Sequence, residues 1–269
     1  MLMRKAIVGT VIGTAAGITI SRTVRWWRTW GVDPTEAAMP LTGDDLVPTP
    51  TAIITRGITI DAPPEAVWPW LVQMGFERAG WYSYDQLDMR GKSADRIVPA
   101  WQKLEVGDIL PVSPAGGFAV RVLEPGHALV IFTDTALVES QAAATASAVR
   151  PDTPAGLAAS GAILRQTPQD FAASWAFALE PLEDGGTRLI ERFRARFGEG
   201  GPGFRVVGPF MGFGVFVMLQ RQMVGIRERA QRTAVAPPLA IPPAKPPRAK
   251  TNGHAVTAEQ TEVVASATT

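Results

Sequence analysis

The protein has 269 residues, 46% of them hydrophobic, which is enough for one large domain or two small ones with a buried core. Its 26 basic and 25 acidic residues nearly cancel, so there is no global electrostatic case for nucleic acid as a partner. The chain lacks Cys and contains only His127 and His254, which excludes disulfides and thiol chemistry, leaves almost nothing for a His-rich metal site, and implies no cofactor.

Residues 1–30 combine an uncharged hydrophobic stretch with flanking basic residues and a tryptophan cluster. A helix from Ala6 to Ile20 is shorter than the roughly 20 residues that cross a bilayer, but snorkelling arginines and interfacial tryptophans extend such a helix. We therefore favour a single-pass membrane anchor. A secretory signal peptide, for which no clear cleavage site follows, and an amphipathic or soluble segment are the alternatives.

The same segment suggests an orientation and a contact. Basic residues are slightly denser after the hydrophobic stretch, which favours a cytoplasmic location for the rest of the chain. Gly9, Gly13 and Gly17 recur every fourth residue, and small residues at this spacing let two membrane helices approach closely. These glycines are therefore candidates for a homodimer contact.

Composition divides the remaining chain into three parts. They are a pre-domain segment at residues 31–50, a folded domain at 51–233 and a disordered Pro/Ala-rich tail at 234–269. Inside the folded domain, residues 136–169 are rich in Ala with scattered Pro and Gly. We expect a flexible insertion there, whose alanine runs can form a short helix.

The folded domain begins with a strand and a helix. β-Branched residues alternate roughly from Ala52 to Ile60, which predicts a strand. The following helix should end near Gly75 and be kinked at Pro69, because proline removes a backbone hydrogen bond. The next stretch, GWYSYD, starts at Gly80 and mixes aromatic residues with a carboxylate.

Five more strands are predicted by apolar alternation between turn signals. They cover Val106–Val112, Phe118–Leu123, Ala128–Thr133, Phe171–Glu180 and Thr187–Phe197. A final helix should start at Pro209, and its nearly all-apolar first half should be enclosed by the concave face of the sheet.

The order of these elements and several sequence segments resemble the helix-grip (SRPBCC) superfamily, which includes START lipid-transfer domains and polyketide cyclase/dehydrases. The phrases that carry the resemblance are ITIDAPPEAVWPWLVQMG, VLEPGHALVIF, SWAFALEPLEDGGTRL and the final helix. GWYSYD and ADRIVPAWQ resemble the membrane-linked, actinobacterial-type members. The resemblance implies an α+β fold: a curved antiparallel sheet of six to seven strands wrapped around the C-terminal helix, with a hydrophobic cavity between them. A seventh strand would fall in the insertion or near residues 96–101.

Glu191 is the titratable group of most interest. Strand parity places it on the cavity face with Leu189 and Phe193, where desolvation would raise the pKa of its carboxyl. It is a candidate general acid or base, and the alternative is a structural ion pair with Arg56 or Arg121.

Further candidates come from GWYSYD, which we expect to form a lid over the cavity, and from the opposite face of the strand that carries Glu191. Tyr84 and Asp85 of the lid are weaker acid/base candidates than Glu191, and an ordered structural lid is the competing interpretation. The arginines on the other face of the same strand are expected to be solvated, or else to meet anionic lipid headgroups. They are Arg188, Arg192, Arg194 and Arg196.

Aromatic residues on the lid, the inner strand face and the final helix are candidate ligand contacts, with simple core packing as the alternative for each one. They are Trp81, Tyr82, Tyr84, Trp175, Phe177, Phe193, Phe213 and Phe216. The favoured hypothesis is a membrane-anchored protein that binds a lipid, isoprenoid or polyketide. The alternatives are a cyclase/dehydratase-type enzyme and a structural membrane protein without a ligand.

Overall fold

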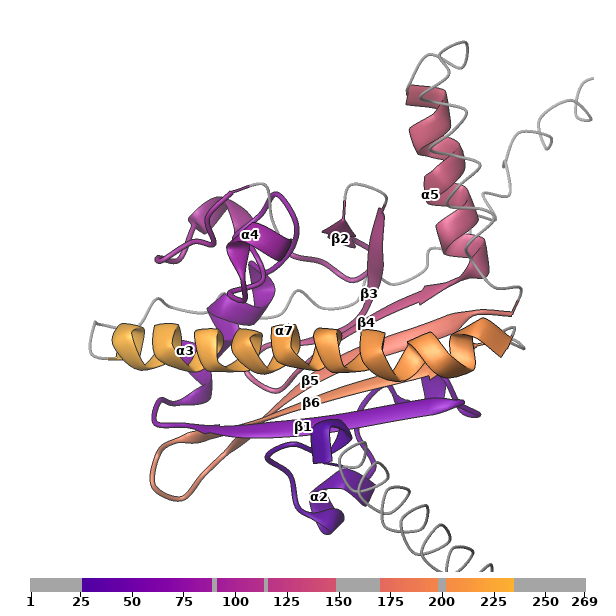
Figure 1. Ribbon diagram of the computed structural model, residues 1–269. Coiled ribbons are helices and arrows are strands. Elements are labelled where there is room, and N and C mark those ends of the chain that lie inside the picture. Colours follow the sequence, from indigo (N-terminus) through magenta and orange to yellow (C-terminus); the bar gives the residue numbers. More distant parts are fainter. Residues whose placement is uncertain (1–25, 89–90, 114–115, 149–169, 198–201, 235–269) are drawn as a thin grey trace, which may run out of the picture.

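The computed structural model describes residues 26–88, 91–113, 116–148, 170–197 and 202–234 (Figure 1). The helices are α2 (Pro34–Ala38), α3 (Pro64–Val72), α4 (Asp85–Asp88), α5 (Thr135–Ala148) and α7 (Pro202–Ala234), with 3-10 turns η1 (Asp44–Leu46) and η2 (Pro99–Trp101). The strands are β1 (Ala52–Ile60), β2 (Ile109–Ser113), β3 (Gly116–Glu124), β4 (Ala128–Asp134), β5 (Ala172–Pro181) and β6 (Thr187–Arg196). The predicted anchor stretch and the tail beyond residue 234 lie outside the described residues.

The six strands form one antiparallel sheet in the order β1-β6-β5-β4-β3-β2. Figure 1 shows α7 running across one face of this sheet, while α2 lies on the far side of β1. The predicted α+β fold, a curved antiparallel sheet that carries a long C-terminal helix, is thereby confirmed. Residues 96–101, one candidate for a seventh strand, contain η2 instead.

The sheet buries side chains on both faces. On the inner face, which α7 covers, β5 contributes Trp175, Phe177 and Leu179 to the core. Register places Phe177 opposite Glu191 of β6, and Glu191 opposite Arg56 of β1. The apolar alternation of the sequence thus sets the inner face, as strand geometry requires.

Helix α7 is longer than predicted. It begins at Pro202 rather than Pro209, because both prolines suit a helix start and the upstream residues continue the helix. Its second half buries Met223, Ile226 and Ala230 in the core, whereas Val215 is exposed. The side chains of residues 202–213, on which the predicted enclosure of the first half depended, lie outside the described part.

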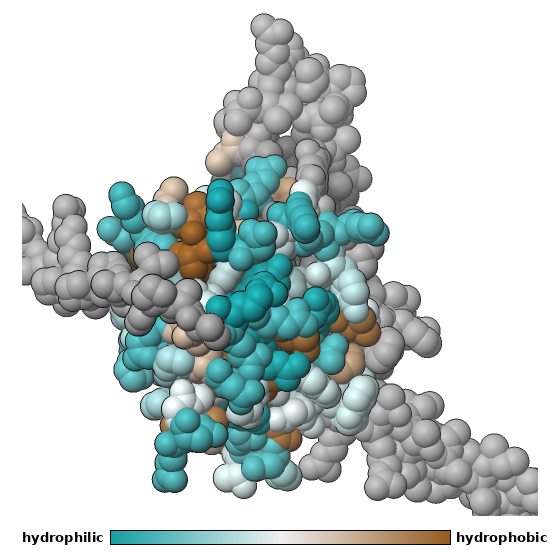
Figure 2. All heavy atoms as spheres, turned by 90° about the vertical axis from the view of Figure 1, so that its left-hand side faces the viewer, coloured by the Kyte–Doolittle hydropathy of each residue, from teal (hydrophilic) through white to brown (hydrophobic). Residues whose placement is uncertain are grey.

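The surface around the C-terminal end of α7 is mainly hydrophilic. Trp70 of α3 donates a hydrogen bond through Nε1 to Thr233 Oγ1 at 3.1 Å, which ties α7 to α3 at this end. Figure 2 views the molecule from this side and shows mainly hydrophilic side chains with scattered hydrophobic ones. None of the helices in the described part of the chain is long and apolar enough to cross a membrane.

The arginine row of β6 is not the solvated surface that the sequence suggested. The outer face is covered by the segment from Asp33 to Val47, and the Arg192 side chain is only 3% exposed. Every nitrogen of Arg192 donates a hydrogen bond. The acceptors are Thr55 Oγ1, Asp44 Oδ2 and the carbonyl oxygens of Glu36, Ala37 and Met39.

Neighbouring arginines hold the same segment. Arg188 donates to the Glu36 carboxylate at 2.7 Å, and Arg194 donates to the Val47 carbonyl oxygen at 3.0 Å. Gly57 of β1 permits this crossing, because a Cβ there would lie 2.7 Å from the Arg188 guanidinium. The physical reason for the error is that alternation marks the polar face of a strand without saying what covers it.

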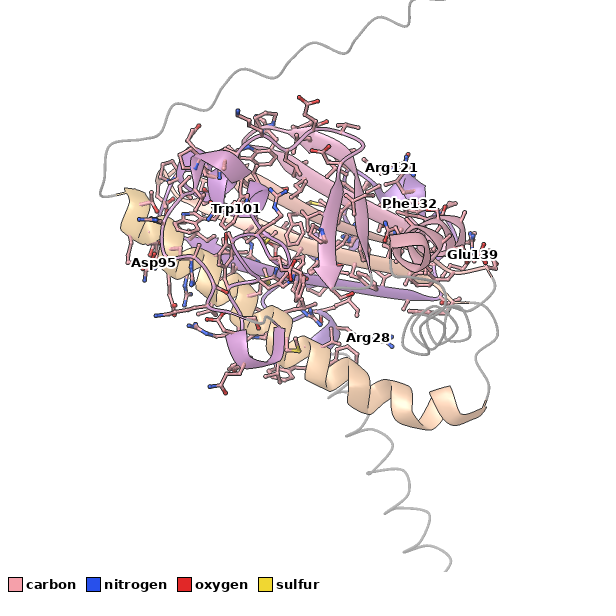
Figure 3. The ribbon with its side chains drawn as sticks, turned by 90° about the horizontal axis from the view of Figure 1, so that it is seen from above. Arg28, Asp95, Trp101, Arg121, Phe132 and Glu139 are labelled. Atoms are coloured by element: carbon pink, nitrogen blue, oxygen red, sulfur yellow. The ribbon has the colours of Figure 1, made fainter. Side chains whose placement is uncertain are left out.

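We predict that Arg192→Ala lowers the free energy of unfolding by about 3 kcal/mol, because three partly buried carbonyl oxygens and Asp44 lose their charged donor. Arg121→Ala is the matched control: Arg121 is exposed over the Phe132 ring on the same face (Figure 3), so its loss should stay within about 0.5 kcal/mol. Denaturant unfolding measures both. Equal effects of the two substitutions would make the row a solvated face after all.

Candidate functional site

A buried ion pair lies at the centre of the inner face. Arg56 and Glu191 are cross-strand neighbours, and their side chains are 1% and 2% exposed. Nη1 of Arg56 lies 4.0 Å from Oε1 of Glu191, which is too far for a hydrogen bond. The predicted alternative partner, Arg121, lies instead over Phe132.

Aromatic side chains surround the carboxylate. Trp175 Nε1 donates a hydrogen bond to Glu191 Oε1 at 2.9 Å. Trp81 of the lid stacks on Trp175 with ring centroids 5.4 Å apart, and Phe118 and Phe193 meet the Trp175 ring edge-on. The Glu191 carboxylate therefore lies among apolar side chains, with Trp175 as a neutral hydrogen-bond donor and Arg56 as a more distant cation.

Arg56 is held firmly on two sides. Its Nε donates to the carbonyl oxygen of Trp27 at 3.2 Å, and its guanidinium carbon lies 5.2 Å from the centre of the Phe216 ring. Trp26, just before Trp27, packs edge-on against the same ring. The free edge of the guanidinium is therefore the one formed by Nη1 and Nη2.

Three atoms of this pair have no hydrogen-bond partner. They are Nη1 and Nη2 of Arg56 and Oε2 of Glu191, three of the seven buried unpaired side-chain atoms in the described residues. The other four belong to four different residues. Buried polar atoms are almost always satisfied, so three unpaired atoms at one place make this pair the candidate site among the described residues.

Burial dominates the electrostatics. Desolvation raises the pKa of Glu191 to about 7, although Arg56 and the Trp175 hydrogen bond lower it. Desolvation also lowers the pKa of Arg56 from its ordinary value, against the opposing effect of Glu191. Glu191 can therefore hold or release a proton near neutral pH, which is the property that a general acid or base needs.

The lid packs on α7 through Tyr82. This residue is buried in a left-handed conformation with φ 57°, its hydroxyl donates to the Trp70 carbonyl oxygen at 3.0 Å, and burial raises its pKa well above the usual range. Arg229 lies over its ring at 4.7 Å. Gly225 admits this contact, because a Cβ there would lie 2.1 Å from the Tyr82 carbonyl oxygen.

The two acid/base candidates in the lid, Tyr84 and Asp85, differ from Glu191 in burial or in hydrogen bonding. Tyr84 is 42% exposed. Asp85 accepts a hydrogen bond from Ser93 Oγ, which in turn accepts one from the Tyr82 backbone N–H. Of the three acid/base candidates, Glu191 is the one that combines deep burial with an unpaired oxygen.

The structure gathers most of the predicted ligand contacts. Trp81, Trp175, Phe177 and Phe193 lie together around Glu191, and Phe216 lies against Arg56. Tyr82 is committed to Trp70, and Tyr84 faces outward. The Phe213 side chain lies outside the described part. Whether any of these residues binds a ligand stays a prediction.

Two contributors were missed by sequence reasoning. The sequence predicted Arg56 only as a possible ion-pair partner of Glu191. It predicted Trp27 only as one of the tryptophans that lie at the membrane interface. Strand parity in AIITRGITI was the available signal for Arg56, because it puts this arginine on the same face as Ile54 and Ile58. No sequence signal leads from Trp27 to Arg56. In the described residues, no three His, Cys, Asp or Glu side chains are grouped so that they could hold a metal ion.

No protein-family profile and no curated protein sequence matches the chain. Among solved structures, it is similar to protein MLL2253 from Mesorhizobium loti, at 16% identity over 68% of this chain and 98% of that one, with a TM-score of 0.34. An uncharacterised protein from Rhizobium leguminosarum matches at 12% identity over 67% of this chain and 95% of that one, with a TM-score of 0.31.

A third similar structure is the di-domain ARO/CYC BexL from the BE-7585A biosynthetic pathway. Its identity is 18%, over 72% of this chain and 54% of that one, and its TM-score is 0.30. Identities and TM-scores this low assign neither a family nor an activity. Membership of the SRPBCC superfamily therefore stays a prediction from the sequence.

We predict that Gly225→Ala destabilises the protein by about 1–3 kcal/mol, because the new methyl group meets the lid backbone. Gly214→Ala in the same helix is the control, since a Cβ there meets no atom within 4 Å. It should stabilise the protein by about 0.5–1 kcal/mol through helix propensity. Thermal unfolding separates the two, and stabilisation by both would mean that the lid does not pack on α7.

Proposed function

We propose that this protein binds a hydrophobic small molecule between the sheet and α7, with the polar end of the molecule at Arg56 and Glu191. The observation that carries the proposal is the contrast between two buried arginines. Arg192 has all three nitrogens bonded to protein acceptors, whereas Arg56, equally buried, uses only Nε. The chain evidently can saturate a buried arginine, so the free edge of Arg56 is a site.

The surroundings support an apolar body for the ligand. Phe118, Phe193 and Leu219 pack against the core but are only partly buried, unlike Trp175 and Phe177 beside them. Small-molecule sites are lined mainly by apolar side chains, with a few polar groups that orient the ligand. A lipid, isoprenoid or polyketide fits this description, as the sequence hypothesis stated.

We further propose that residues 1–30 attach the protein to a membrane. Of the two possible orientations, we favour the one that places the folded domain in the cytoplasm. Trp26 supports the attachment, since it is 55% exposed, follows the hydrophobic stretch after a short basic segment, and packs on Phe216 beside the site. The full chain should stay in the membrane pellet after alkaline carbonate extraction, whereas a chain that starts at Trp26 should be released. Release of both chains would contradict the anchor.

A second candidate function is an enzyme of the cyclase/dehydratase type, favoured by one observation. Glu191 has an unpaired oxygen and a pKa raised to about 7. Such a carboxylate can accept a proton from a carbon next to a ketone, and then return it to a hydroxyl group that leaves as water. In that case the bound molecule would lose the mass of water on incubation.

We predict that native mass spectrometry of detergent-extracted protein detects one small-molecule adduct per chain. The neutral fluorophore N-phenyl-1-naphthylamine should compete for the same site and quench the emission of Trp81 and Trp175. Trp81→Leu should weaken fluorophore binding about tenfold, a loss of about 1.4 kcal/mol. An adduct whose mass falls by one water in the wild type, but not in Glu191→Gln, would favour the enzyme over the binding protein.

Phe132→Leu is the control, because Phe132 lies on the outer face under Arg121. It should leave fluorophore binding unchanged. If neither an adduct nor saturable fluorophore binding is detected, the proposed binding function is wrong and a structural role remains.

A further inference from the structure

The unpaired atoms at the site specify the chemistry of the ligand's polar end. Because Trp27 occupies Nε of Arg56, the remaining donors are the parallel N–H groups of Nη1 and Nη2. Two parallel donors match two acceptor oxygens on one planar group. A hydroxyl or a ketone offers one oxygen and would leave one nitrogen without a partner.

Resting on the proposed function, we infer that the ligand is an amphipathic carboxylic acid, with its carboxylate on Nη1 and Nη2 of Arg56 and a hydrogen bond from protonated Glu191 Oε2. This arrangement satisfies all three unpaired atoms at once. The apolar chain of the acid then lies along Phe193 and Phe118, which are partly buried. No covalent step is involved.

Charge balance selects a monoanion. The site itself contributes one cation, Arg56, and one titratable carboxyl, Glu191. A bound carboxylate beside ionised Glu191 would leave one uncompensated buried negative charge, which is strongly unfavourable. Protonation of Glu191 restores neutrality, whereas a phosphate monoester would keep an excess negative charge even then. The acid should therefore bind together with one proton.

Glu191 is the group that takes up this proton. Arg56 from β1 is the charged group that acts on it, Trp175 from β5 is a neutral donor, and α7 presents the neutral Phe216 ring to Arg56. Its pKa is about 7 without ligand and rises further beside the bound anion. Below pH 7 Glu191 is mostly protonated, and well above it each bound anion must draw a proton from solution.

The test displaces N-phenyl-1-naphthylamine with a matched series of dodecanoic acid, methyl dodecanoate, 1-dodecanol and dodecyl phosphate. We expect the acid to bind at least tenfold more tightly than the other three at pH 6.5. Its affinity should fall about tenfold per pH unit well above pH 7, while that of the ester stays flat. Equal affinities of acid and ester, or a flat pH profile for the acid, would overturn the inference.

Three variants sharpen the result. Arg56→Lys keeps the charge but loses the paired donors, so the preference for acid over ester should shrink to about threefold or less. Arg121→Lys is the matched control, since Arg121 also lies over a phenylalanine, at 5.3 Å against 5.2 Å for Arg56, but on the outer face (Figure 3). It should keep the full preference. Glu191→Gln should bind the acid with a flat pH profile, because its amide donates without titrating.

A full preference in Arg56→Lys, or a retained pH slope in Glu191→Gln, would count against the inference. If Arg56→Lys does not fold, which its circular dichroism spectrum would reveal, the wild-type series and the Glu191→Gln profile still decide. The outcomes separate the two levels. No fluorophore binding by the wild type rejects the proposed function itself, whereas fluorophore binding without acid preference rejects only the ligand class.

Discussion

Burial of charge on the β1–β6 ladder is the constraint on which the rest of this structure depends. A buried guanidinium or carboxylate is tolerated only where hydrogen-bonding partners replace water. On the outer face the protein meets this requirement with its own backbone, as the partners of Arg192 demonstrate. On the inner face it does so only in part, and Arg56 and Glu191 keep three unpaired atoms. The buried charge of Arg192 is therefore fully hydrogen-bonded on the outer face of the β1–β6 ladder, whereas those of Arg56 and Glu191 are only partly hydrogen-bonded on its inner face.

The N-terminal segment connects the two faces. β1 is an edge strand, and residues 26–30 pass beside it: the Trp30 carbonyl oxygen accepts from the Gly57 backbone N–H at 3.1 Å, while Trp27 accepts from Arg56. A segment in this position blocks the exposed edge, which otherwise invites pairing with another chain. It then supplies the acceptors for the outer arginines. A change in this segment thus reaches the inner site through one hydrogen bond.

Much of the secondary structure was predictable because local patterns determine it. β1 matches its predicted bounds. In the β5–β6 hairpin, both ends of β5 and the end of β6 differ from the prediction by one residue, while β6 starts at Thr187 as predicted. These bounds were predictable because alternation and the EDGG turn are signals carried by adjacent residues. The start of α7 was misplaced by seven residues, because two prolines seven positions apart are equivalent N-terminal signals. The solvated arginine row was wrong for a different reason, namely that its cover comes from residues about 150 positions away.

The sequence by itself determined the periodicities, and through them the inner position of Glu191 and the apolar identity of its neighbours. Only the tertiary structure decided that Arg56 is opposite Glu191 but 4.0 Å away, that Trp175 donates to it, and that Trp27 leaves one guanidinium edge free. The register and separation of Arg56 and Glu191 arise from pairing between strands more than 100 residues apart, and no local pattern encodes a distance. Hydrophobic alternation specifies which side chains share a face, and long-range packing specifies which of them lack a partner.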